Sequence, residues 1–116
     1  MRWLITGGAG FIGTNLAAHL LEIGESVTVV DDLSRGGSER NAAFLDERYS
    51  LPINRVDISD REALSGFLAE QPAFDAFAHL AGQVSFLASL EDPRRDFEVN
   101  ALGTLNVLEH VRLGCS

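Results

Sequence analysis

Short apolar runs alternate along the chain with stretches of helical periodicity. Residues 2–6 and 27–30 are largely apolar or β-branched on both faces, as expected for buried strands of a parallel sheet. Between them, apolar side chains recur at intervals of four, four and three, which predicts a helix over 11–23 that ends at Gly24. The apolar stripe of this helix consists of Ile12, Leu16, Leu20 and Ile23.

The middle of the chain continues the alternation. After a loop rich in Ser, Gly and Arg, we expect a short helix over 39–47. Residues 51–56 are a weaker strand candidate, because Pro52 lacks a backbone donor. The tetrapeptide Ser-Asp-Arg-Glu at 59–62 fits a capping box, so Ser59 is expected to cap the next helix.

The last third predicts one more strand and one long helix. Residues 74–80 form an apolar run. Asp92 is a suitable helix cap, Pro93 suits a first turn, and Gly114 stands where a terminating glycine is expected. The periodic apolar positions of this helix are Phe97, Ala101, Leu105 and Leu108. The predicted order is therefore four strands, each followed by a helix.

Composition excludes several classes of function. The 116 residues have a formal net charge of -8 and no basic run, which argues against nucleic-acid binding through phosphate neutralisation. No stretch approaches the roughly 20 apolar residues of a membrane span, and we recognise no targeting segment. The single cysteine, Cys115, favours a reducing compartment, so we expect a cytoplasmic protein. All nine basic residues are arginine, which excludes lysine chemistry within this chain.

A glycine cluster at the end of the first predicted strand is the strongest chemical signal. Residues 6–13 read Thr-Gly-Gly-Ala-Gly-Phe-Ile-Gly, and they lead directly into the first predicted helix. A glycine leaving the strand allows a tight turn, Gly10 lets the backbone approach a pyrophosphate, and Gly13 lets the helix pack closely. The helix N-terminus then offers free N–H groups to the phosphates.

Asp31 completes this dinucleotide-binding pattern. It ends the next strand, 18 residues beyond Gly13, where an acid accepts hydrogen bonds from an adenosine ribose. A carboxylate there repels a 2′-phosphate, which favours NAD over NADP. Arg35 leaves NADP open as an alternative, since a nearby arginine can bind that phosphate. A glycine-rich turn without a ligand is the structural alternative.

The predicted fold is α/β: the N-terminal part of a Rossmann doubly wound parallel sheet, with strand order 3-2-1-4 and one domain over 1–116. Ligands bind beyond the carboxyl ends of such strands, where 80–83 and Asp57 would lie. Asp57 is equally well explained as a loop acid before a helix cap. His79 precedes 80–83 within an apolar run and is expected to be a packed histidine. No metal-ligand spacing joins the three histidines.

Three longer stretches of sequence carry a resemblance to a known family. They are Thr6 to Gly13, Asp32 to Asn41, and His79 to Val84 followed by Asp92 to Asn106. Over nearly its whole length the chain resembles the extended short-chain dehydrogenases/reductases, in particular the NAD-dependent epimerases/dehydratases of nucleotide sugars, and most of all their CDP-paratose 2-epimerase branch. The resemblance implies NAD as cofactor and a nucleotide sugar as substrate.

The resemblance also implies which residues surround the cofactor. The pyrophosphate would lie at Gly7, Gly10, Phe11, Ile12 and Gly13. The adenosine would be surrounded by Asp31, Asp32, Ser34 and Arg35, with Asp57 and Ile58 flanking the adenine. Leu80, Ala81, Gly82 and Gln83 would lie along the cofactor, and Asn100 would approach it from the last helix. At Asp32 the family often has Asn instead.

The family's catalytic Tyr-x-x-x-Lys motif and its sugar-nucleotide-binding portion are absent from this sequence. We therefore expect a truncated sheet with no catalytic residue, inactive on its own. Two alternatives remain open. One is a stand-alone dinucleotide-binding or regulatory module. The other is an interaction protein that pairs through the edge of 74–80. We expect the chain to form dimers or larger oligomers.

Overall fold

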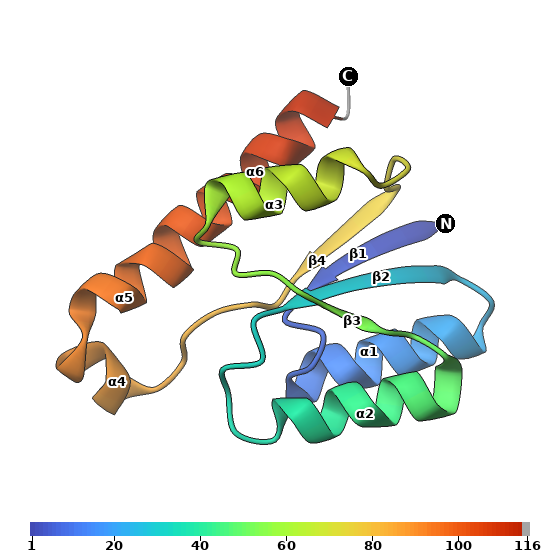
Figure 1. The fold of residues 1–116 in the computed structure, drawn as a ribbon, viewed down its shortest axis with the longest axis horizontal. Coiled ribbons are helices and arrows are strands. Elements are labelled where there is room, and N and C mark those ends of the chain that lie inside the picture. The colour runs from blue at the N-terminus through green and yellow to red at the C-terminus, as the bar shows by residue number, and fades with distance from the viewer. Residues whose placement is uncertain (115–116) are drawn as a thin grey trace.

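The computed structural model describes residues 1–114, and Cys115, which motivated the expectation of a reducing compartment, lies outside them. Four parallel strands form one sheet in the order β3-β2-β1-β4. This confirms the predicted strand order (Figure 1). The strands are β1 (Arg2–Thr6), β2 (Ser26–Asp31), β3 (Ile53–Arg55) and β4 (Ala76–His79).

Helices cover both faces of the sheet (Figure 1). The helices α1 (Phe11–Glu22) and α2 (Ser38–Tyr49) lie on one face, and α3 (Arg61–Ala69) and α6 (Gly103–Gly114) lie on the other. Two further short helices, α4 (Phe86–Glu91) and α5 (Pro93–Phe97), extend beyond the carboxyl ends of the strands. The π-helical segment η1 (Glu98–Leu102) joins α5 to α6.

Strands β1 and β2 each send neighbouring side chains into two separate cores. Leu4 and Val30 pack on the side of α3 and α6, whereas Ile5 and Val29 pack on the side of α1 and α2. All four are fully buried. Burial on both faces explains why these strands read as continuous apolar runs rather than alternating ones.

The first helix forms as predicted, but its buried face differs from the expected stripe. Leu16 and Leu20 of the expected stripe pack in the core as predicted. Ile12 and Ile23 are instead 66% and 59% exposed, and the buried face is completed by Gly13, Thr14 and Ala17. The physical reason is the close contact of the N-terminal turn with the glycine cluster, which only small residues permit. Gly24, at φ +88°, follows the end of the helix as expected.

The predicted cap of the third helix was also wrong by one residue. Asp60 is the cap, because its carboxylate accepts a hydrogen bond from the N–H of Ala63. The hydroxyl of Ser59 instead donates to Asp57 at 2.7 Å. Because the Asp57 carboxylate already accepts from the Ser59 hydroxyl, the next residue, Asp60, caps the helix.

The last predicted helix differs most from the structure. The helix is interrupted by the wider turn of η1, and α4 before it was not predicted. Because η1 shifts the helical register, the expected stripe does not face the core. Leu105 and Leu108 are more than half exposed, and Val107 is buried instead.

Candidate functional site

The glycine turn after β1 is held tightly against the start of the loop that follows β4. Gly7 has φ +74° and donates from its N–H to the carbonyl of Val30 at 2.9 Å. A Cβ at Gly7 would lie 2.6 Å from the backbone nitrogen of Ala81. The sequence motif therefore requires glycine here for two reasons, the left-handed backbone and the close neighbouring chain.

Gly13 and Gly10 occupy contrasting environments within the same motif. A Cβ at Gly13 would lie 2.2 Å from the carbonyl oxygen of Gly7, so the helix packs directly on the turn. A Cβ at Gly10 would approach nothing closer than that same oxygen at 3.3 Å. The next atom is a guanidinium nitrogen of Arg35 at 4.0 Å. The backbone at Gly10 is thus accessible from outside, whereas Gly13 is enclosed by protein.

Phe11 and Ile12 form the first turn of α1 beside this accessible backbone. Their side chains are 82% and 66% exposed. N–H groups of a helix's first turn have no acceptor within the helix, and they carry its partial positive charge. No acidic residue lies in this turn to neutralise that charge. The turn is therefore suited to bind an anion.

Asp31, at the end of β2, links the glycine turn to the following loop. One carboxylate oxygen accepts from the N–H of Ala9 at 3.0 Å, and the other accepts from the N–H of Leu33 at 2.7 Å. Each oxygen of an ionised carboxylate has two acceptor positions. One position on each oxygen therefore remains open, and two neighbouring hydroxyl groups could fill them.

The residues after Asp31 form a compact polar turn. Asp32 accepts from both the N–H and the hydroxyl of Ser34, at 3.0 and 2.7 Å. The carbonyl of Arg35 accepts from the hydroxyl of Ser38 at 2.7 Å, which fixes the loop to the start of α2. Since the guanidinium of Arg35 is near Gly10, this loop brings a positive charge to the glycine turn.

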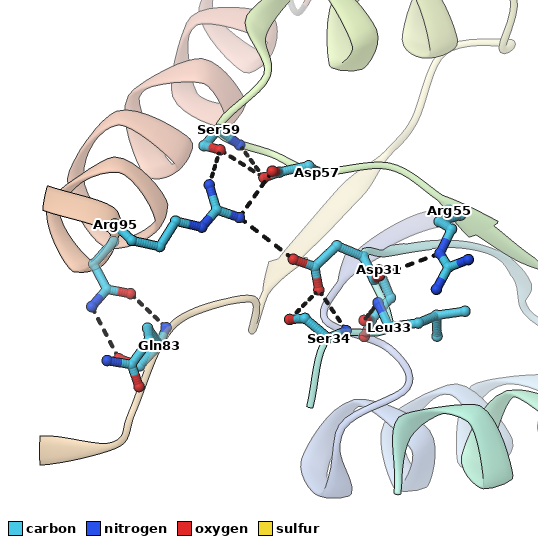
Figure 2. A network of polar contacts seen from close by, with 10 residues as sticks. Asp31, Leu33, Ser34, Arg55, Asp57, Ser59, Gln83 and Arg95 are labelled. Carbon is cyan, nitrogen blue, oxygen red and sulfur yellow. Dashed lines mark hydrogen bonds and ion pairs between the residues drawn. The ribbon is translucent and has the colours of Figure 1, made fainter. Parts of the chain in front are cut away.

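Asp57, after β3, is part of a charged cluster that reaches across to α5 (Figure 2). It accepts from Ser59 and pairs with the guanidinium of Arg95 at 2.9 Å. Burial opposes ionisation of Asp57, but the Ser59 hydrogen bonds and the Arg95 charge outweigh it and hold the pKa below its ordinary value. Sequence reasoning missed Arg95, because no local motif connects it with a residue 38 positions earlier.

Ile58 lies beneath this cluster. Its side chain is only 4% exposed and packs against Gly103 at the start of α6. Its carbonyl accepts from the side-chain amide of Asn106 at 2.8 Å. The sequence placed Ile58 at the adenine, whereas the structure places its side chain in the core, so only its backbone could contact a ligand there.

The loop after β4 is held by β1 from one side and by η1 from the other. The hydroxyl of Thr6 accepts from the N–H groups of Leu80 and Ala81, at 3.1 and 3.2 Å. The side-chain amide of Asn100 binds both the N–H and the carbonyl of Gln83, at 2.7 and 3.0 Å. Gly82 lies between these anchors, and a Cβ there would be 3.2 Å from the Asn100 oxygen.

His79 connects the two anchors of this loop. The hydroxyl of Thr104 donates to the carbonyl of Asn100, so it accepts from Nε2–H of His79 at 2.9 Å. Nδ1 of His79 is then the acceptor for the hydroxyl of Thr6 at 2.6 Å. Burial lowers the pKa of His79, which favours this neutral form. The residue is packed, as predicted.

The predicted residues thus meet at one edge of the sheet, except for the side chain of Ile58. A groove with a volume of about 500 Å³ lies elsewhere, between α3 and α6. Within residues 1–114 no group of three His, Cys, Asp or Glu side chains is placed to hold a metal ion. No helix in the same range is long and apolar enough to cross a bilayer.

Comparison with known proteins relates the chain to one family. Residues 3–115 match the profile of the NAD dependent epimerase/dehydratase family. The chain is 40% identical over 112 residues to CDP-paratose 2-epimerase of Salmonella typhi, covering 97% of this chain and 33% of that protein. It is 41% identical to UDP-glucose 4-epimerase of Mycolicibacterium smegmatis, covering 97% and 35% of the two chains.

Solved structures show the same relationship. UDP-glucose 4-epimerase of Thermus thermophilus, solved in complex with NAD, is 41% identical with a TM-score of 0.81. The UDP-Glc/GlcNAc 4-epimerase of Campylobacter jejuni is 28% identical with a TM-score of 0.85. These matches cover 99% and 98% of this chain but 35% and 34% of those proteins. The chain therefore spans about a third of the length of its relatives.

Proposed function

The chain belongs to the NAD dependent epimerase/dehydratase family, and we propose that it is the NAD-binding, N-terminal portion of a nucleotide-sugar epimerase or dehydratase. For the intact protein we propose an activity of the CDP-paratose 2-epimerase type on a nucleotide sugar. The sequence identity of 40% over 97% of this chain supports that assignment.

The single observation that carries this proposal is the accessible backbone at Gly10 beside the first turn of α1. A pyrophosphate placed there would accept hydrogen bonds from the N–H groups of Phe11 and Ile12, in the field of the helix N-terminus. Gly10 leaves room for it, since no atom lies within 3.3 Å of a Cβ at that position. Gly7 and Gly13 would hold the turn in shape beneath it.

The two open acceptor positions of Asp31 suit the neighbouring hydroxyls of an adenosine ribose. Asp32 and Ser34 would border the same sugar. A phosphate on the 2′-oxygen would remove one hydroxyl donor and place negative charge beside two carboxylates, at positions 31 and 32. We therefore propose NAD rather than NADP. Arg35, near Gly10, would then serve the pyrophosphate.

The loop after β4 would form the wall along the cofactor toward its nicotinamide end. The residues that we propose for this wall are Leu80, Ala81, Gly82 and Gln83, with Asn100 behind them. The anchors described above fix the backbone of this wall before any ligand binds, so little ordering would oppose binding.

The bound NAD would take a hydride from a sugar carbon and return it later in the reaction. This chain would bind and orient the cofactor, and we propose that it supplies no acid–base residue. It has no lysine, and its single tyrosine, Tyr49, donates to Glu22 at 2.6 Å, between α2 and α1. On its own the chain would have no turnover.

A stand-alone dinucleotide-binding module is the second candidate, favoured by the complete phosphate-binding turn. Two measurements on purified protein separate the candidates: calorimetric titration with NAD and NADP, and conversion of CDP-, UDP- and dTDP-linked sugars. The proposal predicts tighter binding of NAD than NADP, and sugar conversion by the intact protein only. NAD binding without conversion by the intact protein would favour the module, and absence of NAD binding would refute both.

A further inference from the structure

Arg95 joins three polar groups that come from the ends of two neighbouring strands (Figure 2). Its guanidinium donates to the hydroxyl of Ser59 at 2.8 Å and to the carboxylate of Asp57 at 2.9 Å. The same group lies 3.7 Å from the carboxylate of Asp32. Strands β2 and β3 are thereby connected to α5, although α5 is far from both in the sequence.

The backbone of α5 fixes the origin of this side chain. Asp92 caps the helix by accepting from the N–H of Arg95 at 3.0 Å, and Pro93 occupies the first turn. The Arg95 side chain is 37% exposed. Its neighbour Arg94 is exposed on the same helix. The two arginines are therefore adjacent residues of one helix in different environments.

The hydrogen bonds of Asp57 leave it one open acceptor position. An ionised carboxylate has four such positions, two on each oxygen. One oxygen of Asp57 accepts from both the N–H and the hydroxyl of Ser59, at 2.9 and 2.7 Å. The other oxygen accepts from Arg95, which fills one of its two positions. The other position on that oxygen has no partner among the described residues, and the side chain is 35% exposed.

We propose that Arg95 is a positioning residue of the cofactor site, which holds the Asp57 carboxylate so that its remaining acceptor position meets the amino group of the adenine ring. This inference rests on the NAD site proposed above. The amino group donates a hydrogen bond to an ionised carboxylate. A purine with a carbonyl oxygen in place of the amino group would put this oxygen, an acceptor, against the Asp57 carboxylate. Such a purine should be bound less well.

This difference provides a test with two dinucleotides. NAD and nicotinamide hypoxanthine dinucleotide have the same pyrophosphate and riboses, and they differ at that substituent of the purine. Hypoxanthine also carries a hydrogen on N1, which is an acceptor in adenine, so the ratio of the two dissociation constants measures recognition of this edge of the purine. A variant that loses charge or folded protein would weaken both ligands together and leave the ratio unchanged.

The experiment is calorimetric titration of the intact protein with both dinucleotides. The variants are Arg95→Met, Arg95→Lys as the conservative replacement, and Arg94→Met as the matched control. We expect the wild type and Arg94→Met to prefer NAD by about tenfold, the loss expected for one hydrogen bond to a charged group. We expect Arg95→Met to reduce the ratio to about twofold or less, and Arg95→Lys to restore part of it.

The possible results separate this inference from the proposed function. A wild-type ratio in Arg95→Met, or equal binding of the two dinucleotides by the wild type, would overturn the role of Arg95 while leaving NAD binding in place. Failure of the wild type to bind NAD at all would refute the proposed function and the inference with it.

Discussion

Replacing Gly10 and Gly13 by alanine should separate cofactor binding from folding. At Gly13 the added methyl would lie 2.2 Å from the carbonyl oxygen of Gly7 and 2.6 Å from Cα of Gly8. Both obstacles are backbone atoms, so the turn must move, and overpacking of this kind costs about 1–3 kcal/mol of unfolding free energy. Gly13→Ala should therefore be clearly less stable than the wild type.

Gly10→Ala should behave in the opposite way. The backbone at Gly10 has φ −78° and ψ 178°, which alanine adopts freely, and the new methyl would be 3.3 Å from its nearest neighbour. The unfolding free energy should change by less than about 1 kcal/mol. The methyl would point into the space proposed for the pyrophosphate. Losing one backbone hydrogen bond to a charged phosphate should weaken NAD binding about 10- to 100-fold.

Urea denaturation followed by circular dichroism measures stability, and calorimetric titration with NAD measures affinity. Gly66→Ala in α3 is the matched control, since nothing lies within 4 Å of a Cβ there. It should raise stability by up to about 1 kcal/mol and leave NAD affinity unchanged. Wild-type NAD affinity in Gly10→Ala, or wild-type stability in Gly13→Ala, would refute the reasoning.

Two further predictions concern His79 and the assembly state. Burial lowers the pKa of His79 from its ordinary value of 6.5, so the unfolded chain binds the proton more readily than the folded one. The unfolding free energy should fall as the pH drops below about 6.5, and denaturation at a series of pH values should show a shallower fall for His79→Gln. In the 116-residue chain on its own, the exposed Leu105 and Leu108 on α6 and the outer edge of β4, which pairs with no further strand among the described residues, should support a homodimer or larger oligomer. Light scattering at high concentration tests this, and a monomer would contradict it.

The strand order and the position of the site could be predicted from local patterns. Leu4, Ile5, Val29 and Val30 are buried on both faces, so the strands appear as continuous apolar runs. Gly7 requires a left-handed backbone, which the motif records directly in the sequence. The sheet then brings Asp31 to the glycine turn without further information.

What could not be predicted depends on contacts between distant segments. The pairing of Arg95 with Asp57 needs the path of α5 relative to β3, which no local pattern contains. The wider turn of η1 is an interruption that the apolar periodicity does not record, so the buried face of α6 was assigned wrongly. Similarly, the capping-box pattern predicted Ser59 as the cap of α3. It does not record the hydrogen bond from Ser59 to Asp57, which takes the hydroxyl away from that role.

A crystal structure of the intact protein with NAD would test the central claim most directly. We predict that the pyrophosphate lies within about 3 Å of the N–H groups of Phe11 and Ile12, and that the adenosine ribose hydroxyls donate to the two oxygens of Asp31. A dinucleotide bound elsewhere, with the glycine turn and Asp31 making no contact to it, would contradict the account.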